Sequence, residues 1–284
     1  KMSKSIGNII SPDEMIEKHG ADVLRYYMCQ TNAGQDVRFS WDEATLKGRY
    51  LKILWNVHKL LINLSKENKF NPFKLDVKKF APEEKYILSK LNSTIKKVTD
   101  LFDEYHFDET IAPMEELFLE LSRVYIQIIR DKSVLGSVDE KKAVVYTIGY
   151  VMFECLKMFN IIAPFVCEAI YLNLKDEFGL KEESISHYSW PEVDKKKIDV
   201  KLEEQMEIAQ HVITAAAYAR ERSQLGLRWP VSEVLVVSDK ENVAEALEKL
   251  QDIIKKQTNS KDIKLVKSVP KGEFADAESK AGNV

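Results

Sequence analysis

Cysteine is scarce in this sequence, and the sites that depend on it are missing. The three cysteines, Cys29, Cys155 and Cys167, are far apart, and none forms the Cys-x-x-Cys spacing that many zinc sites use. The five histidines do not cluster with them. We therefore expect no metal site, and mostly buried, reduced thiols of the kind found in cytoplasmic proteins.

Long apolar runs and a positive net charge are missing as well. No run of about 18 or more apolar residues occurs, which argues against a membrane span. The net charge is −3, whereas general nucleic-acid binders are usually basic, so any RNA contact must come from local patches. The hydrophobic fraction of 45% is typical of globular proteins. Since the chain begins with Lys, we expect a piece of a longer protein.

Apolar residues recur every three or four positions from Asp42 to about Asp176, which predicts successive amphipathic helices. The predicted buried stripes are Leu46, Tyr50, Ile53, Val57, Leu60 and Leu64; Leu88, Leu91, Ile95, Val98, Phe102 and Tyr105; Ile111, Met114, Leu117, Leu121, Val124 and Ile128; Val144, Ile148, Val151, Cys155 and Phe159; and, after Pro164, Phe165, Val166, Ala169, Ile170 and Leu174. Similar helices joined by short loops indicate an antiparallel bundle.

The pattern changes toward the C-terminus. A helix is expected from Lys201 to Arg222, followed by a β-branched strand from Val231 to Val237, a helix from Lys240 to Lys256 and a strand from Ile263 to Val266. The predicted fold is therefore mainly α, an antiparallel helical bundle with a small C-terminal α/β appendage. We expect a loop and connecting segment at 1–42, the bundle at 43–190, the further helix and α/β subdomain at 191–272, and a frayed or truncated end at 273–284.

The first five residues, Lys1-Met2-Ser3-Lys4-Ser5, combine two ammonium groups with two hydroxyls. Such donors suit a triphosphate, where negative charge builds on the leaving group. On charge pattern alone, a solvated basic loop explains them more often.

Taken as a string, these five residues are the KMSKS signature of class I aminoacyl-tRNA synthetases, which the chain resembles. The resemblance continues through these segments: Gly7-Asn8, Ser11-Pro12-Asp13, Gly20-Ala21-Asp22, Leu24-Arg25, Asp36 to Glu43, Leu121-Ser122-Arg123, Ile129 to Lys132, Ala163-Pro164-Phe165, Ser189-Trp190-Pro191 and Leu227 to Pro230. They resemble the isoleucine, valine and leucine branch, and most closely isoleucine enzymes of the archaeal and eukaryotic kind. The likeness runs from Lys1 to about Val237.

The resemblance implies that the parent protein activates isoleucine with ATP and Mg²⁺ and transfers it to tRNA. Lys4 and Lys1 are then the catalytic residues, and Lys1, Met2, Ser3, Lys4 and Ser5 bind ATP. The partner motif His-x-Gly-His of this class and its parallel sheet are not in this sequence. The chain alone is therefore expected to be inactive, without a tightly bound cofactor, and to hold isoleucine tRNA by its anticodon end. The family branch is generally monomeric.

Proteins read RNA with aromatic and basic side chains, so the candidate tRNA contacts combine the two. They are Arg123, Arg130, Lys132, Arg220, Arg222, Arg228 and Trp229. Arg123 and Arg130 are seven positions apart, hence on one face of a regular helix, where they could also serve the helix dipole. Trp229 could instead pack beneath the next strand. A basic stretch from Lys255 to Lys271 could touch phosphates, although a solvated surface explains it more often.

Other residues and readings stay open. We interpret Trp41, Trp55 and Trp190 as packing residues, and Asp108, Glu109, Glu115 and Glu116 as a solvated acidic face. The same region of a valine enzyme is the nearest alternative function. A non-catalytic helical module for protein interaction is another, and it would show an exposed apolar patch in place of a basic surface.

Overall fold

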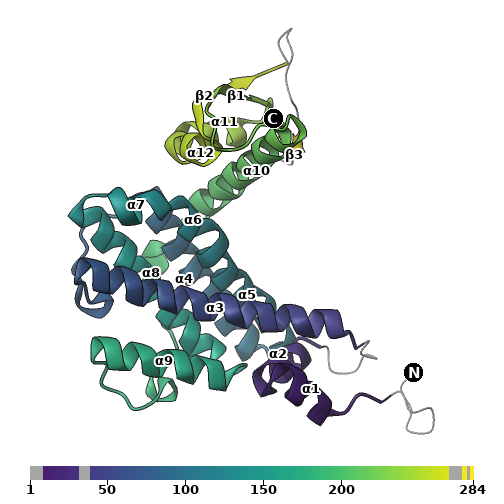
Figure 1. Ribbon diagram of the computed structural model, residues 1–284, viewed down its shortest axis with the longest axis vertical. Coiled ribbons are helices and arrows are strands. Elements are labelled where there is room, and N and C mark those ends of the chain that lie inside the picture. The colour runs from purple at the N-terminus through teal and green to yellow at the C-terminus, as the bar shows by residue number, and fades with distance from the viewer. Residues whose placement is uncertain (1–8, 32–38, 269–276, 280–281) are drawn as a thin grey trace. The chain divides into compact units, whose positions relative to one another are not determined.

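The computed structural model describes residues 9–31, 39–268, 277–279 and 282–284, and the chain divides into two compact units, residues 1–198 and 199–284 (Figure 1). The signature Lys1–Ser5 lies outside the described residues. The fold is mainly helical, as predicted. Among the described residues, no helix is both long and apolar enough to cross a membrane, and no cluster of potential metal ligands occurs.

The first unit is a helical bundle preceded by two short helices. Its helices are α1 (Pro12–His19), α2 (Ala21–Cys29), α3 (Trp41–Asn68), α4 (Pro82–Asp103), α5 (Ile111–Glu120), α6 (Ile126–Ile128), α7 (Arg130–Leu135), α8 (Val138–Phe159) and α9 (Pro164–Phe178), with short turns at η2 (Pro72–Lys74), η3 (Phe107–Thr110), η4 (Leu121–Tyr125), η5 (Ile185–His187) and η6 (Lys195–Lys197). Helix α8 packs against α3 and α4, and α5 packs against α4 and α8.

Local sequence sets several helix starts. The hydroxyl of Ser11 accepts from the amide of Asp13, and that of Ser40 accepts from Glu43. Ser137 and Glu140 form a capping box at the start of α8. Proline at the first position of α1, α4 and α9 already has the helical φ angle and lacks an amide that would need a partner there.

The predicted stripe of α8 is confirmed, because Val144, Ile148, Val151, Cys155 and Phe159 are all fully buried. The predicted stripe of α3 is only partly confirmed: Val57 and Leu64 are buried, but Leu46 is 38% exposed. The side that α3 buries comprises Ala44, Lys47, Leu51, Leu54, Val57, His58, Leu61, Leu64 and Ser65. Leucines lie on two sides of this helix. Because the buried side also contains the polar residues Lys47 and His58, the hydrophobicity pattern does not identify it as the buried side.

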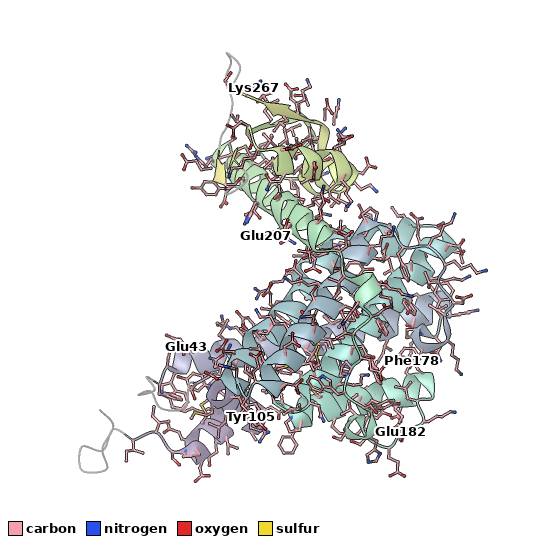
Figure 2. The ribbon with its side chains drawn as sticks, turned by 180° about the vertical axis from the view of Figure 1, so that it is seen from behind. Glu43, Tyr105, Phe178, Glu182, Glu207 and Lys267 are labelled. Carbon is pink, nitrogen blue, oxygen red and sulfur yellow. The ribbon has the colours of Figure 1, made fainter. Side chains whose placement is uncertain are left out.

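One predicted helix ends earlier than expected, and another is interrupted. Helix α4 ends at Asp103, so the predicted Tyr105 lies beyond it, with φ of 64° and a side chain that is 79% exposed (Figure 2). The third predicted helix becomes π-helical over Leu121–Tyr125 and breaks at Ile129, whose φ and ψ are −88° and 3°. The seven-residue spacing therefore does not place Arg123 and Arg130 on one regular helix face.

The tryptophans pack as predicted. The indole nitrogen of Trp190 donates to the hydroxyl of Thr99 at 2.9 Å, and its ring meets Phe102 edge to face. Trp41 contacts Phe39 in the same way, and Trp55 contacts His58. All three are half-buried.

The second unit combines helix α10 (Val200–Arg222) with a small sheet. Its elements are β1 (Val231–Val237), α11 (Glu241–Lys249), α12 (Gln251–Thr258), β2 (Ser260–Val266), β3 (Glu278–Ser279) and β4 (Gly282–Asn283). Strands β1 and β2 are parallel, and the order of the strands in the sheet is β2-β1-β4-β3. The predicted α/β appendage is thus present.

Two details of this unit differ from the prediction. One helix was expected from Lys240 to Lys256, but it breaks at Leu250, which is buried. The break lets both α11 and α12 bury apolar residues. A frayed end was expected at 273–284, yet Ala277 is buried against Ala215 and Ala219 of α10.

Candidate nucleic-acid interface

The segment that follows α10 is exposed but well ordered by its own hydrogen bonds. Gln224, at φ 55°, occupies the left-handed position just past the helix. The amide of Leu225 donates to the carbonyl of Arg220 at 2.9 Å, and that of Gln224 donates to Glu221 at 3.0 Å. This is the Schellman pattern of helix ends. A turn follows, in which the amide of Trp229 donates to the carbonyl of Gly226 at 3.1 Å.

Two side chains hold that turn from below. The guanidinium of Arg220 donates to the carbonyls of Gly226 and Trp229 at 3.3 and 2.9 Å. The side-chain amide of Asn259 donates to the carbonyls of Leu227 and Arg228 at 2.8 and 3.3 Å. All four consecutive carbonyls of the turn are therefore bound by a side chain.

The side chains of the turn point to solvent. Trp229 is 63% exposed and Leu227 is 54% exposed, and both Arg222 and Arg228 are exposed. The alternative that Trp229 packs beneath the next strand is thus wrong. The turn presents an indole surface with arginine beside it, an arrangement that can stack on a base and pair with phosphate.

Arg220 differs from the other candidates in this group because it is only 7% exposed. Besides the turn, its guanidinium donates to the carbonyls of Thr258 and Asn259 at 2.8 and 3.1 Å. Burial lowers the pKa of this side chain. Both terminal nitrogens of the guanidinium donate to backbone carbonyls, so we assign Arg220 to holding the turn and not to touching RNA.

In the first unit, Arg123 and Arg130 are exposed. The guanidinium carbon of Arg123 lies 5.4 Å from the centre of the Tyr50 ring on α3, within cation–π range. The π-helical turn η4 positions it there. Arg130 follows the break at Ile129 and begins α7.

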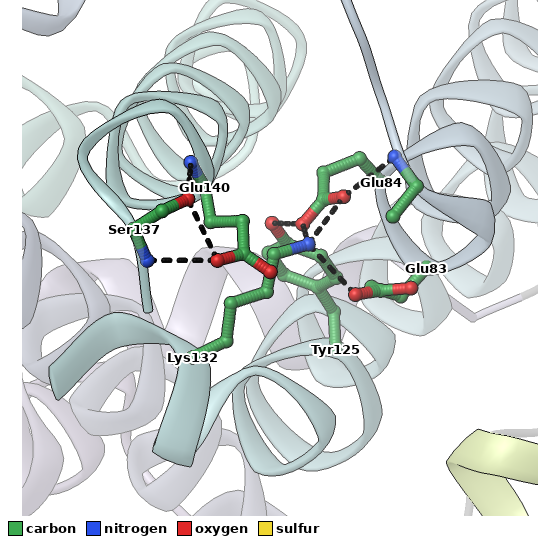
Figure 3. A network of polar contacts seen from close by, with 7 residues as sticks. Glu83, Glu84, Tyr125, Lys132, Ser137 and Glu140 are labelled. Carbon is green, nitrogen blue, oxygen red and sulfur yellow. Dashed lines mark hydrogen bonds and ion pairs between the residues drawn. The ribbon is translucent and has the colours of Figure 1, made fainter. Parts of the chain in front are cut away.

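Lys132 is occupied by an internal ion network (Figure 3). Its ammonium lies 2.7 Å from a carboxylate oxygen of Glu83 and 2.8 Å from both oxygens of Glu84, at the start of α4. Glu84 is fully buried, accepts from the amide of Ala81, and accepts from the hydroxyl of Tyr125 at 3.2 Å. Lys132 therefore ties α7 to α4, which differs from the role predicted for it.

The pKa values in this network follow from its burial. Desolvation and the neighbouring Glu83 raise the pKa of Glu84, although Lys132 opposes this. Burial alone would lower the pKa of Lys132, but its hydrogen bonds and charge pairing with Glu83 and Glu84 raise it. Burial raises the pKa of Tyr125 well above its ordinary value, so Tyr125 stays a neutral donor.

Glu115 was predicted to lie on a solvated acidic face, and this is wrong. Its carboxylate accepts from Lys47 of α3 and from the hydroxyl of Tyr26 on α2, each at 2.5 Å. The Lys47 ammonium also lies 4.7 Å from the centre of the Tyr26 ring. Glu115 thus joins three helices, and its partners are too distant in the sequence for a local pattern to reveal.

Sequence reasoning missed Asn259 as a site residue. It lies in the left-handed conformation directly after α12, at φ 47° and ψ 50°. A helix ending in Lys255 and Lys256 followed by Asn is a recognisable C-terminal signal. That signal predicts the backbone of Asn259 but not the carbonyls to which its side chain donates.

Comparison with known families gives matches along most of the chain. Residues 84–236 match the family described as the anticodon-binding domain of tRNA ligase, and residues 1–40 match class I tRNA synthetases (I, L, M and V). The isoleucine–tRNA ligase of Methanothermobacter marburgensis is 37% identical over 276 residues, which are 95% of this chain and 26% of the relative. That of Thermococcus kodakarensis is 37% identical over 268 residues, 93% of this chain and 25% of the relative. The chain spans about a quarter of the length of these relatives.

Among solved structures, the LeuRS–tRNA–LeuAMS ternary complex of Agrobacterium radiobacter K84 is similar, with a TM-score of 0.52 and 16% identity. The similarity covers 70% of this chain and 23% of that one, and at this identity it shows the fold alone. The match to residues 84–236 spans more than half of the sequence. The chain therefore belongs to the anticodon-binding domain family of class I tRNA ligases.

Proposed function

We propose that this chain is the tRNA-binding portion of an isoleucine–tRNA ligase and that it holds isoleucine tRNA by its anticodon end. The family match over residues 84–236 carries this proposal, because it covers the bundle from α4 onward, the helix α10 and the exposed turn that follows it. The identity to isoleucine–tRNA ligases along more than nine-tenths of the chain supports isoleucine over valine.

Within this proposal, Arg222 and Arg228 contact tRNA phosphates beside Trp229, and Arg123 and Arg130 make contacts from the first unit. All five side chains are exposed. Phosphate contacts of this kind position RNA and make its binding sensitive to salt. Because the net charge is −3, these local arginines have to supply the attraction.

The chemistry of the longer protein belongs to the same proposal. There, the loop Lys1–Ser5 binds ATP with its Mg²⁺, and Lys4, helped by Lys1, stabilises the charge of the departing pyrophosphate. This assignment rests on the signature string and on the match of residues 1–40. We also propose that the protein acts as a cytoplasmic monomer.

The test is the affinity of this chain for two transcripts, isoleucine tRNA with its GAU anticodon and the same transcript recoded to the valine anticodon GAC. Tighter binding to GAU that weakens with added salt is the expected result. Tighter binding to GAC would move the assignment to valine. Equal and weak binding to both would reject anticodon recognition by this chain.

The catalytic part is tested in the longer ligase with Lys4→Ala. Isoleucine-dependent pyrophosphate exchange should slow by about tenfold or more, with little change in tRNA affinity. An unchanged exchange rate would remove Lys4 from the mechanism.

A further inference from the structure

We propose that the turn Gly226–Trp229 is a binding site for one unpaired nucleobase, which stacks on the exposed indole of Trp229. In this site Arg220 and Asn259 are positioning residues that hold the turn in its binding conformation. This inference rests on the proposed function, since it assigns part of tRNA binding to one turn.

The exposure of Trp229 is the first observation. Tryptophan is highly buried on average in folded proteins, yet Trp229 is 63% exposed, and Leu227, two positions earlier, is 54% exposed. Between residues 220 and 230 the sequence holds three arginines and a single acidic residue, Glu221. An apolar ring in a basic setting suits a ligand with a flat aromatic face and negative charge nearby, which is the chemistry of a nucleotide.

The support beneath the turn is the second observation. Arg220 is a nearly buried charged side chain, and the carbonyls that its guanidinium binds all belong to the turn or to the end of α12. Burying a charge is costly unless it is well hydrogen-bonded. The charge-assisted hydrogen bonds of the Arg220 guanidinium are thus used to fix the conformation of an exposed turn. Asn259 adds the two carbonyls that Arg220 does not reach.

Such support has a consequence for binding. A turn that is already fixed loses little conformational entropy when a ligand binds, so more of the contact energy appears as affinity. The indole of Trp229 and the guanidinium of Arg228 both extend from this fixed turn. Bases of a duplex are already stacked on their neighbours, whereas an unpaired base in a loop has a free face for the indole.

The test measures tRNA affinity for Trp229→Ala and Trp229→Phe, with Trp55→Phe as the control on α3. Trp229→Ala should weaken binding by about tenfold, and Trp229→Phe should recover most of it because a phenyl ring still stacks. Trp55→Phe should leave affinity unchanged. Direct stacking should also quench the fluorescence of Trp229 when tRNA is added to the parent chain. That part of the fluorescence is identified as the part missing from the Trp229→Phe variant.

The positioning role is tested with Asn259→Gly, since glycine keeps the left-handed backbone but removes both side-chain hydrogen bonds. Affinity should fall severalfold while circular dichroism and the thermal midpoint stay close to those of the parent. Arg220→Lys, which keeps the charge but loses the forked geometry, should act in the same direction. If Arg220→Lys does not fold, Asn259→Gly decides the matter alone.

The outcomes separate this inference from the proposed function. A parent chain without tRNA affinity would reject the proposed function, and the inference with it. If the parent chain binds tRNA, two results together would overturn the stacking site alone: equal affinity of the Trp229→Ala variant, and no quenching of the Trp229 fluorescence in the parent. Full affinity in a folded Asn259→Gly variant would overturn the positioning role.

Discussion

The guanidinium of Arg25 donates a 2.9 Å hydrogen bond to the carbonyl of Ile162, 137 positions later in the chain. A second bond, also 2.9 Å, reaches the carbonyl of Ile161. From the same helix α2, Asp22 accepts from the amides of Phe165 and Val166 at 3.3 and 2.6 Å. Two residues of α2 thus bind this corner of the fold: Arg25 binds the turn after α8, and Asp22 binds the first turn of α9.

Asp22 is predicted to be a stabilising helix cap acting from a distance. Position 163, where a capping side chain would stand, is alanine, so Asp22 satisfies the first amides of α9. Asp22→Ala should lower the free energy of unfolding by about 1–2 kcal/mol, measured by urea denaturation. The exposed Asp76→Ala is the control and should change it by less than about 0.5 kcal/mol. Equal effects of the two substitutions would contradict this account of Asp22.

The ion network of Lys132 gives a second prediction. Lys132→Met leaves Glu83 and Glu84 without their cation, so the free energy of unfolding at neutral pH should fall by about 3–5 kcal/mol. Adding Glu84→Gln should recover part of this loss, because the buried charge is then gone. Lys142→Met is the control, since Lys142 makes an exposed pair with Asp139, 3.7 Å away, and it should have almost no effect.

The same network predicts a pH dependence of the difference between parent and Lys132→Met. The pKa of Lys132 is raised in the folded state, so its stabilisation is fully present below the unfolded pKa of about 10.4 and is lost as the pH rises through the folded pKa. The pKa of Glu84 is also raised, so lowering the pH toward about 4.3 lets it take up a proton and reduces the cost of the missing lysine. The difference should therefore be largest near neutral pH. A difference that does not change between acid and neutral pH would contradict the charge assignment of Glu84.

The thiols give a third prediction. Cys29 is exposed, whereas Cys155 and Cys167 are fully buried. Burial raises the pKa of Cys155 to about 12 and that of Cys167 well above its ordinary value, so neither forms a reactive thiolate near neutral pH. A chromogenic thiol reagent should therefore label one cysteine in the folded chain and three in denaturant. Rapid labelling of more than one cysteine before unfolding would show that the packing around α8 and α9 is looser than described.

Local sequence patterns predict much of this fold. The stripe of α8 and the strand β1 follow from patterns of nearby residues, and both match the predicted residues. The stripe of α3 is predicted only in part, because Lys47 and His58 are buried through partners on other elements, Glu115 on α5 and Asn173 on α9.

The candidate site shows the same limit. Arg220 and Lys132 look like surface cations in the sequence, but each has an acceptor far away in the chain, 38 positions later for Arg220 and 48 positions earlier for Lys132. The turn that carries Trp229 is also bound by Asn259, which lies 30 positions after Trp229 and which no local pattern contains. Hydrophobic periodicity predicts the helices and strands. Hydrogen bonds between distant residues determine which charged side chains have internal partners, and the periodicity does not predict them.

The central claim is that this chain binds the anticodon end of tRNA, and the most direct test separates the two ends of that molecule. The chain would be titrated with an isolated anticodon stem–loop of isoleucine tRNA and, separately, with a minihelix of its acceptor arm. The account predicts saturable, salt-sensitive binding of the stem–loop and much weaker binding of the minihelix. Preference for the acceptor minihelix would contradict it.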